Sequence, residues 1–194
     1  SIKTALQKAH IVFYINGHNK KPDEATAKKI KNYLGDWVKV YSVYNVRGGA
    51  SDYDEEEDRE TLFTEGVKKN ESLIKEEFKK ILGDVYKGNL TVQGKLAMCA
   101  KASFSKKRGD LIKDQQKLLR YFDGSPEKVL QFSQFQTIVN LIDEKSANFK
   151  KEIIEANKQK LISLASKIAD DISNTMVSQK TYVDRLKGNL NVAE

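Results

Sequence analysis

Residues 38–44 read Val-Lys-Val-Tyr-Ser-Val-Tyr, and residues 45–49 continue as Asn-Val-Arg-Gly-Gly. The first seven are rich in β-branched and aromatic side chains, which favours a strand, and the glycine pair favours a loop. In α/β proteins, ligands bind at the loops that follow the carboxyl ends of parallel strands. This stretch therefore predicts an α/β domain with a ligand-facing loop that begins at Asn45.

Two more strand signals flank this stretch, at His10–Ile15 and, more weakly, at Asn89–Val92. Apolar residues at helical spacing fill the segments between and after the strands, at 22–34, 62–82 and 95–104. Strands joined by helices of this length form parallel β-α-β units with right-handed crossovers. The expected fold class is α/β, with a partial three-stranded parallel sheet and flanking helices, followed by a long α-helical segment.

The sequence also indicates where the first and second strands lie in the sheet. Lys39 and Ser42 interrupt the second strand, and because fully buried parallel strands are apolar throughout, we expect this strand at an edge or near a strand end. The first strand, His10–Ile15, would expose an apolar edge, and such edges invite pairing with another chain. We therefore expect self-association through this edge, or a helix that covers it.

The second half of the chain carries no strand signal. Ser125-Pro126-Glu127 combines an N-cap with proline at the first helical position, and apolar residues then recur at spacings of three and four. A helix from about Phe149 to Gln179 would be roughly 45 Å long. We expect it to project as a stalk or to pack on helices that this chain lacks; the alternative is an antiparallel hairpin lying on the same domain. The expected division is an α/β part at 1–122 and a helical part at 123–194.

Composition limits the classes of binding partner and the cellular compartment that we expect. The net charge is +7, but the lysines are scattered among glutamates, as on solvated helix faces, so a nucleic-acid partner is not expected. The single cysteine, Cys99, lies in an apolar run and should be a buried residue in a reducing compartment. No apolar run is long enough to span a bilayer. We expect a cytoplasmic protein, with any membrane contact at the surface, and a piece of a longer protein because the chain begins in helix-like sequence without Met.

Little in the sequence points to enzyme chemistry. His10 and His18 are the only histidines, and neither belongs to a metal-ligand motif. The acidic run Asp52–Glu60 is expected as an exposed loop; the alternative is a site for a cation or a basic partner. Lys106–Arg108 is expected as a solvated loop. The sequence predicts no catalytic residue and no metal ligand.

Four segments resemble, in order, those of dynamin-like large GTPases. Residues 2–14 resemble the helix and strand that follow the D-x-x-G segment of that family. Asn45-Val46-Arg47-Gly48 lies where the family has N-K-x-D and is similar to the N-V-R-G of some bacterial dynamin-like proteins. Residues 92–97 would cover the last base-contacting segment, and residues 131–161 resemble the passage into the helical middle domain. The resemblance implies the C-terminal half of a GTPase domain plus the start of the middle domain.

Such a parent would couple GTP binding and hydrolysis to self-assembly and membrane remodelling. The resemblance gives Asn45, Arg47 and Lys95 as candidate nucleotide-contacting residues; Arg47 would either cover a base face or point to solvent. Gly48, however, replaces the carboxylate that reads guanine, and the chain contains no G-x-x-x-x-G-K-[ST] to hold phosphates. GTP and Mg²⁺ are therefore expected in the parent, and this chain should be inactive alone.

Two other classes of function stay open. The chain could be a non-enzymatic helical interaction module, in which Asn45–Gly49 is only a turn built on permissive glycines. Nucleic-acid binding is the hypothesis with the least support, because basic residues do not cluster with aromatic residues in a stacking pattern.

Overall fold

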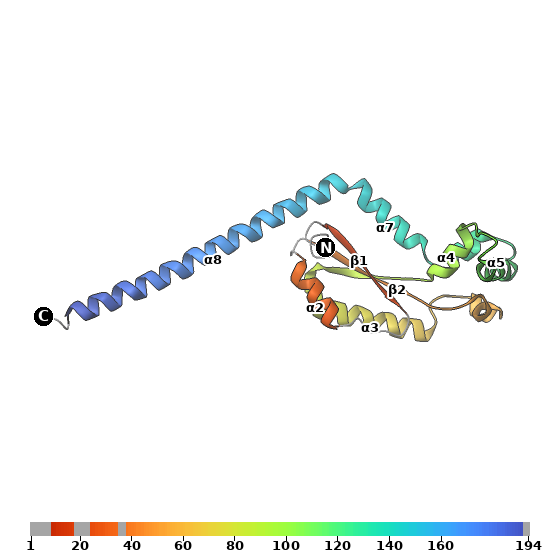
Figure 1. Cartoon of the computed structure of the whole chain (residues 1–194), viewed down its shortest axis with the longest axis horizontal. Helices are drawn as coiled ribbons and strands as arrows, with labels where there is room; N and C mark the ends of the chain where they lie inside the picture. Colours follow the sequence, from red (N-terminus) through yellow and green to blue (C-terminus); the bar gives the residue numbers. More distant parts are fainter. Residues whose placement is uncertain (1–8, 18–23, 35–37, 192–194) are drawn as a thin grey trace.

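A three-stranded sheet with flanking helices leads into one long helix (Figure 1). The computed structural model describes residues 9–17, 24–34 and 38–191. His18 and most of the segment 2–14 that resembles the GTPases lie outside these residues. The chain has the expected α/β fold class.

The sheet contains β1 (Ile11–Gly17), β2 (Lys39–Asn45) and β3 (Tyr86–Val92). Its order is β1-β2-β3, and both pairings are parallel. The third strand begins earlier than its sequence signal at Asn89. Because all three strands run in the same direction, their carboxyl ends lie together at one end of the sheet.

The second strand is central, so its expected position at an edge was wrong. Ser42 is fully buried, and its hydroxyl donates to Asn89 Oδ1 at 2.7 Å while lying 2.8 Å from the Tyr86 hydroxyl. Because Ser42 donates its single hydroxyl proton to Asn89, the Tyr86 hydroxyl must donate to the Ser42 oxygen. Lys39 is the first residue of the strand, where its ammonium pairs with Glu152. Polar residues are tolerated in this central strand because each has a partner.

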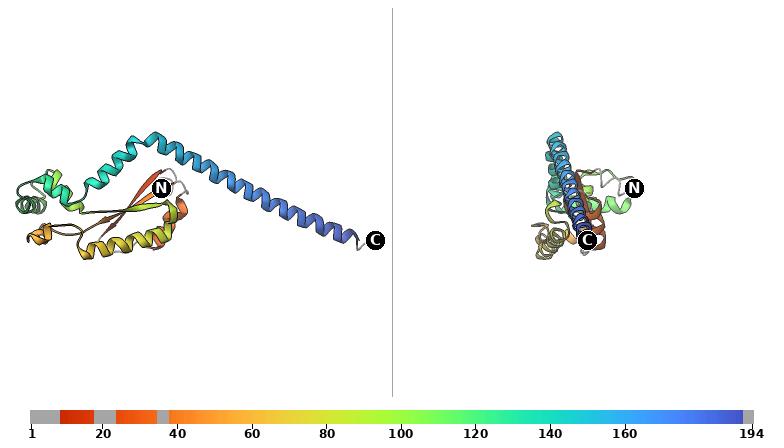
Figure 2. Two further views of the ribbon diagram at one scale, coloured as in Figure 1. Left: turned by 180° about the vertical axis from the view of Figure 1, so that it is seen from behind. Right: turned by 90° about the vertical axis from the view of Figure 1, so that its left-hand side faces the viewer.

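One face of the sheet is covered by α2 (Glu24–Tyr33) and α3 (Glu65–Leu82) (Figures 1 and 2). Phe78 of α3 is fully buried, with its ring 5.0 Å from that of Tyr14 and 5.5 Å from that of Tyr86. The Thr64 side chain caps the start of α3. The helix ends at Gly83, whose φ of 64° is a conformation that favours glycine.

A second core lies beyond the carboxyl ends of the strands. It joins Tyr53, Leu96, Cys99, Leu118 and Val129. These residues belong to η1 (Ala50–Tyr53), α4 (Gly94–Lys101), α5 (Gly109–Tyr121) and α6 (Pro126–Phe132). Helix α5 was not expected from the sequence. The burial of Cys99 is confirmed, and the division of the chain after residue 122, which falls inside this cluster, stays a prediction.

The helical second half is split at two points. The predicted N-cap of α6 is confirmed, since Ser125 Oγ accepts a hydrogen bond from the Lys128 backbone N–H at 3.2 Å. Gln134, with a φ of 58°, separates α6 from α7 (Gln136–Ala147), and Asn148 separates α7 from α8 (Phe149–Asn191). Helix α8 contains 43 residues and projects away from the sheet as the expected stalk (Figures 1 and 2). It begins where the sequence predicted and continues beyond Gln179.

The acidic run forms an exposed loop, as expected, with one exception. Tyr53 is buried in the second core. Arg59, at the end of η2 (Glu57–Arg59), donates from Nη1 to the carbonyls of Tyr53, Asp54 and Glu55 at 2.6–2.8 Å. The loop is therefore held by its own arginine. Lys106–Arg108 is an exposed turn, also as expected.

The remaining short element, η3 (Gly83–Val85), connects α3 to β3. Within the part of the chain that the structure describes, no helix combines the length and apolar character needed to cross a membrane.

Candidate ligand-binding site

The carboxyl ends of β2 and β3 are tied together by a side chain. Asn45, the last residue of β2, accepts a hydrogen bond through Oδ1 from the backbone N–H of Gly94, at 2.9 Å. A backbone hydrogen bond from Val46 N–H to the Val92 carbonyl, 2.8 Å long, lies beside it. A Cβ atom on Gly94 would lie 3.2 Å from Asn45 Oδ1, so glycine permits this close approach. The two loops therefore form one unit.

The buried side chain of Gln93 also joins the loops that follow β2 and β3. The sequence pattern did not identify this residue as part of a site. Its Oε1 caps α4 by accepting from the backbone N–H groups of Lys95 and Leu96, at 2.9 and 3.4 Å. Its Nε2 donates to the Gly48 carbonyl at 3.2 Å, and the side chain is only 1% exposed. Glutamine is not a preferred N-cap residue. The only sequence signal was its place between a strand and an apolar helix.

Gly48 is the tightest point of the loop after β2. A Cβ atom there would lie 3.1 Å from both Asp52 Oδ2 and the Tyr53 hydroxyl, and 3.4 Å from Gln93 Nε2. Asp52 Oδ2 in turn accepts from Gly49 N–H at 2.8 Å. Burial raises the pKa of Tyr53, a shift that its hydrogen bond with Gln93 opposes. Gly48 thus occupies space that no side chain could enter without moving polar neighbours.

Arg47 is exposed and lies against the end of the first strand. A Cβ atom on Gly17 would lie 3.1 Å from Arg47 Nη2. The guanidinium is in no ion pair with the residues that the structure describes. At the same strand end, the buried Nδ2 of Asn16 has no hydrogen-bond partner among the described residues. Arg47 therefore joins Asn45 at the carboxyl end of the sheet and leaves its charge available to an anionic or planar group.

Lys95 is directed to a different partner. Its Nζ lies 2.6 Å from Asp114 Oδ2 on α5. The hydrogen bond with Asp114 is the main cause that raises the pKa of Lys95. Of the three predicted residues, Asn45 and Arg47 lie at the sheet end, while the ammonium of Lys95 serves to fasten α4 to α5.

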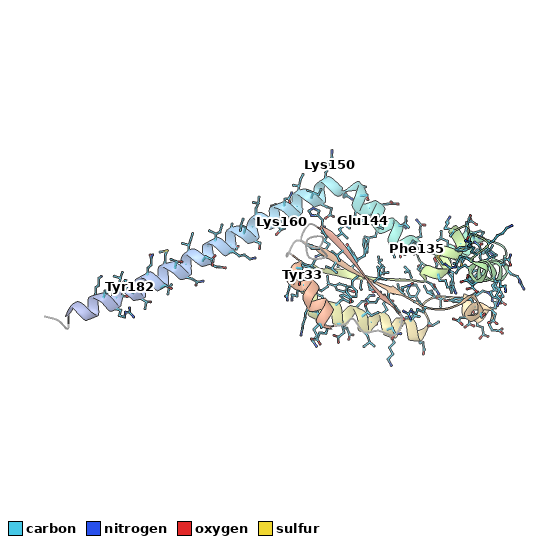
Figure 3. All side chains as sticks on the ribbon, viewed as in Figure 1. Tyr33, Phe135, Glu144, Lys150, Lys160 and Tyr182 are labelled. Carbon is cyan, nitrogen blue, oxygen red and sulfur yellow. The ribbon has the colours of Figure 1, made fainter. Side chains whose placement is uncertain are left out.

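An apolar hollow of about 330 Å³ adjoins Asn45 on the face of the sheet that α7 crosses. Phe13 and Val43 form part of its floor, and Phe135, labelled in Figure 3, and Ile138 form part of its wall. Ile15, at the rim, is 70% exposed. The described residues that line it include no carboxylate, histidine, cysteine or hydroxyl group. These residues can therefore contact an apolar or planar group, but they supply no acid, base or nucleophile.

These residues do not fit a guanine-specific site. Gly48 cannot supply the carboxylate that would accept hydrogen bonds from the guanine edge, and the Gly94 N–H is already used by Asn45. Among the residues that the structure describes, no group of three histidine, cysteine, aspartate or glutamate side chains is arranged to hold a metal ion. The site is thus a braced loop pair with one available arginine and an apolar hollow.

A second polar cluster lies at the opposite end of the strands, where α8 begins. Glu152 pairs with Lys39, and its Oε1 lies 3.6 Å from Lys145 Nζ. His10 and Ala156 line a hollow of about 180 Å³ beside these residues. The buried Nδ1 of His10 has no hydrogen-bond partner within residues 9–17, 24–34 and 38–191. This cluster attaches α8 to the sheet.

Comparison of the chain with protein-family models, with curated proteins and with solved structures gave no match.

Proposed function

We propose that this chain is the carboxyl half of a dynamin-like GTPase domain together with the first part of its helical segment. The observation that carries the proposal is the hydrogen bond from Gly94 N–H to Asn45 Oδ1. In that family, the asparagine of N-K-x-D braces neighbouring loops. Asn45 stands at the matching position and joins the loop after β2 to the loop after β3.

The order of the sheet also supports the proposal. In a small-GTPase sheet, the fourth, fifth and sixth strands lie side by side and parallel at one edge. Strands β1, β2 and β3 have this arrangement. The outer edge of β1 would then face the phosphate-loop strand of the parent, and among the described residues β1 pairs only with β2.

The nucleotide chemistry would belong to the parent. Phosphate binding and Mg²⁺ require a phosphate loop, which this sequence does not contain. Asn45 would organise the base-side loops, Arg47 would cover a base, and Lys95 would hold α4 in place through Asp114. We propose that the parent couples GTP binding and hydrolysis to self-assembly and remodelling at a cytoplasmic membrane surface, and that this chain alone is inactive.

The test is nucleotide binding with and without an upstream segment. Fluorescence of mant-GTP is measured with the 194-residue chain and with a product of the same gene extended by about 100–150 upstream residues, the size of an ordinary domain. We expect no binding by the first and saturable binding by the second. In the longer product, Asn45→Ala should weaken binding about tenfold through loss of the loop brace.

Asn174→Ala is the matched control, because Asn174 lies exposed on α8, remote in sequence from both loops. It should leave mant-GTP binding unchanged. An upstream region without G-x-x-x-x-G-K-[ST], or a longer product that does not bind nucleotide, would contradict the proposal.

One observation favours a second function, a non-enzymatic helical interaction module. Much of α8 presents apolar side chains to solvent, and contiguous exposed apolar surface marks interaction sites. Under this alternative, neither form of the chain binds mant-GTP, and a helical partner binds the chain without nucleotide.

A further inference from the structure

The guanidinium of Arg47 lies at the rim of the apolar hollow beside Asn45. Phe13 and Ile15 of β1 line this hollow, so both side chains lie on the face of the sheet that α7 crosses. Side chains alternate between the two faces along a strand, and the Cβ position of Gly17 therefore belongs to the same face. That position is 3.1 Å from Arg47 Nη2. Arg47 thus places its charge on the face that contains the hollow, just beyond Ile15.

The polar groups at this rim are hydrogen-bond donors. Asn45 lines the hollow, and its Oδ1 already accepts from the Gly94 N–H at 2.9 Å. Its Nδ2 donates to no residue in the described part of the chain, so the amide has its donor side available. Arg47 carries only donors, and it forms no ion pair within residues 9–17, 24–34 and 38–191. These groups favour a ligand whose head consists of oxygen acceptors.

The number of available charges favours a head group with a single negative charge. Of the two cations in the loops after β2 and β3, Arg47 and Lys95, the second is paired with Asp114 at 2.6 Å. A guanidinium binds one carboxylate through two parallel N–H···O hydrogen bonds. A phosphate chain carries several charges, and a single available guanidinium would leave most of them without a partner. A carboxylate is therefore the best match for Arg47.

The body of the hollow is apolar and has an inner end. Val43 forms part of its floor, and Phe135, at the start of α7 in Figure 3, forms part of its wall. Tyr41 lies on the same face two residues before Val43, and its ring stacks on that of Phe13 with centroids 5.8 Å apart. This pair of rings closes the hollow toward the amino ends of the strands. An apolar group that enters from the rim would therefore leave its head beside Arg47.

The size of the hollow suits a small molecule better than a protein segment. Its volume of about 330 Å³ lies in the range of small-molecule sites. One turn of a helix about 10 Å wide occupies about 400 Å³, which exceeds the whole hollow. An extended segment would bring backbone N–H and C=O groups that need partners, whereas most of the described lining is apolar.

Pairing of β1 with a second copy of the chain would not fill the hollow either. Edge pairing uses the backbone groups on the outer side of the strand and extends the sheet in its own plane. The hollow lies on the face of the sheet, between Phe13 and Val43 on one side and α7 on the other. The face and the edge are therefore separate surfaces.

We propose that this hollow binds a monocarboxylate with an apolar body, of the class of medium-chain fatty acids. The carboxylate lies against Arg47 and the amide of Asn45, and the apolar body lies between the sheet and α7. This binding requires neither a phosphate loop nor a nucleotide. It goes beyond the proposed GTPase lineage and holds whether or not the parent binds GTP.

The test compares decanoate with decanol on the full 194-residue chain, below the concentration at which decanoate forms micelles. Isothermal titration calorimetry at pH 7 should show saturable binding of one decanoate, about tenfold tighter than decanol, because only the carboxylate forms charge-assisted hydrogen bonds. Added salt should reduce this difference. Equal affinities for the two molecules, or no saturable binding of decanoate, overturn the proposal.

A charge variant tests the head-group contact. Arg47→Gln should weaken decanoate binding about tenfold and leave decanol binding unchanged, because only the charge on the rim is lost. Arg185→Gln is the matched control, since Arg185 is an exposed arginine on α8. It should change neither affinity. Decanoate binding that is unaffected by Arg47→Gln overturns the assignment of the carboxylate to this rim.

A second pair of variants tests the location of the apolar body. Ile15→Glu places a carboxylate at the rim and should abolish decanoate binding, whereas Ile154→Glu, on α8, should not. The two isoleucines are 70% and 68% exposed, so neither change disturbs a core, and circular dichroism checks the fold. Amide chemical shifts on decanoate addition should change around residues 13–17, 43–47 and 135–138. Shift changes confined to α8, or binding that survives Ile15→Glu, overturn the proposal.

Three other occupants of the hollow are outcomes of the same titration. Excess guanosine monophosphate that displaces decanoate would identify a nucleotide site. A decanoate affinity that falls as the chain concentration rises would show that a second copy covers the hollow. Loss of decanoate binding in the product extended upstream would show that upstream residues fill it. Each result overturns the proposal, whereas mant-GTP binding by the longer product is measured separately and tests only the GTPase lineage.

Discussion

Glu152, in the first turn of α8, pairs with Lys39, the first residue of β2, although 113 residues separate them. Lys145 of α7 approaches the same carboxylate. The base of the projecting helix is therefore fixed to the central strand of the sheet by one carboxylate and two ammonium groups. The direction of α8 relative to the sheet depends on this contact and on the burial of Ala156.

Glu152→Gln should loosen the base of α8. The pair is partly exposed, so we expect a loss of about 0.5–1 kcal/mol in the free energy of unfolding at pH 7. The more sensitive readout is the distance distribution between spin labels on β2 and on α8, which should broaden. Asp170→Asn, an exposed carboxylate of α8 remote from Lys39, is the control and should change neither quantity.

The same pair should make stability depend on pH in acid. The hydrogen bond from Lys39 is the main cause that holds the pKa of Glu152 below its ordinary value of 4.5, with Lys145 acting in the same direction. Because the folded pKa is the lower one, the pair stabilises the fold above pH 4.5, and this contribution is lost as the pH falls through the folded pKa. Urea unfolding should show the difference between wild type and Glu152→Gln shrinking below pH 4.5; a difference that grows there would contradict this account.

Asn45→Ala should separate the loops after β2 and β3. The change removes the acceptor of the Gly94 N–H, and the loss of such a partly buried hydrogen bond costs about 1–2 kcal/mol. Amide exchange at Gly94 should become faster, while exchange in α3 should not. If Gly94 keeps its wild-type exchange rate, the brace does not exist in solution.

Two neighbouring glycines provide a paired test of loop packing. A Cβ on Gly48 would press on Asp52, Tyr53 and Gln93, whereas the nearest atom to a Cβ on Gly49 is 4.0 Å away. We expect Gly48→Ala to lower the free energy of unfolding by about 1–3 kcal/mol and Gly49→Ala to change it by less than about 1 kcal/mol. If urea unfolding shows the same loss in the free energy of unfolding for both variants, Gly48 is not more tightly packed than Gly49.

Cys99 should react slowly with Ellman's reagent in the native chain. Burial raises the pKa of its thiol, and the nearby Asp114 carboxylate adds to the shift, so little thiolate is present at pH 7. Leu118→Ala opens the core next to Cys99 and should speed the reaction, whereas the exposed substitution Val177→Ala should not. Rapid labelling of the native wild type would contradict the burial of Cys99.

The outer edge of β1 gives a test of self-association. Ile15 is exposed on a strand whose outer side pairs with no described residue. If this edge mediates association, sedimentation should show a concentration-dependent dimer that Ile15→Lys abolishes, because a lysine on an edge strand opposes pairing. A wild-type monomer over the whole concentration range, with rapid amide exchange in β1, would remove the hypothesis.

The sequence by itself determined the features that depend on neighbouring residues. The alternation of short β-branched strands with helical segments predicted three parallel strands, because crossovers of this length permit little else. Ser125 and Pro126 predicted the start of α6 from local capping chemistry, and the spacing of apolar residues predicted the start of α8. The asparagine at the end of β2 was also identifiable, since strand ends are where α/β proteins place ligand-reading groups.

Only the tertiary structure decided which distant groups meet. Ser42 looked incompatible with a central strand until Tyr86 and Asn89 satisfied its hydroxyl, and Gln93 became visible as a brace only when its contact with Gly48 was known. The pairing of Lys95 with Asp114, which turns its charge toward α5, has no local signature. Buried polar groups are stable only with a partner, and chain folding, not sequence proximity, supplies that partner.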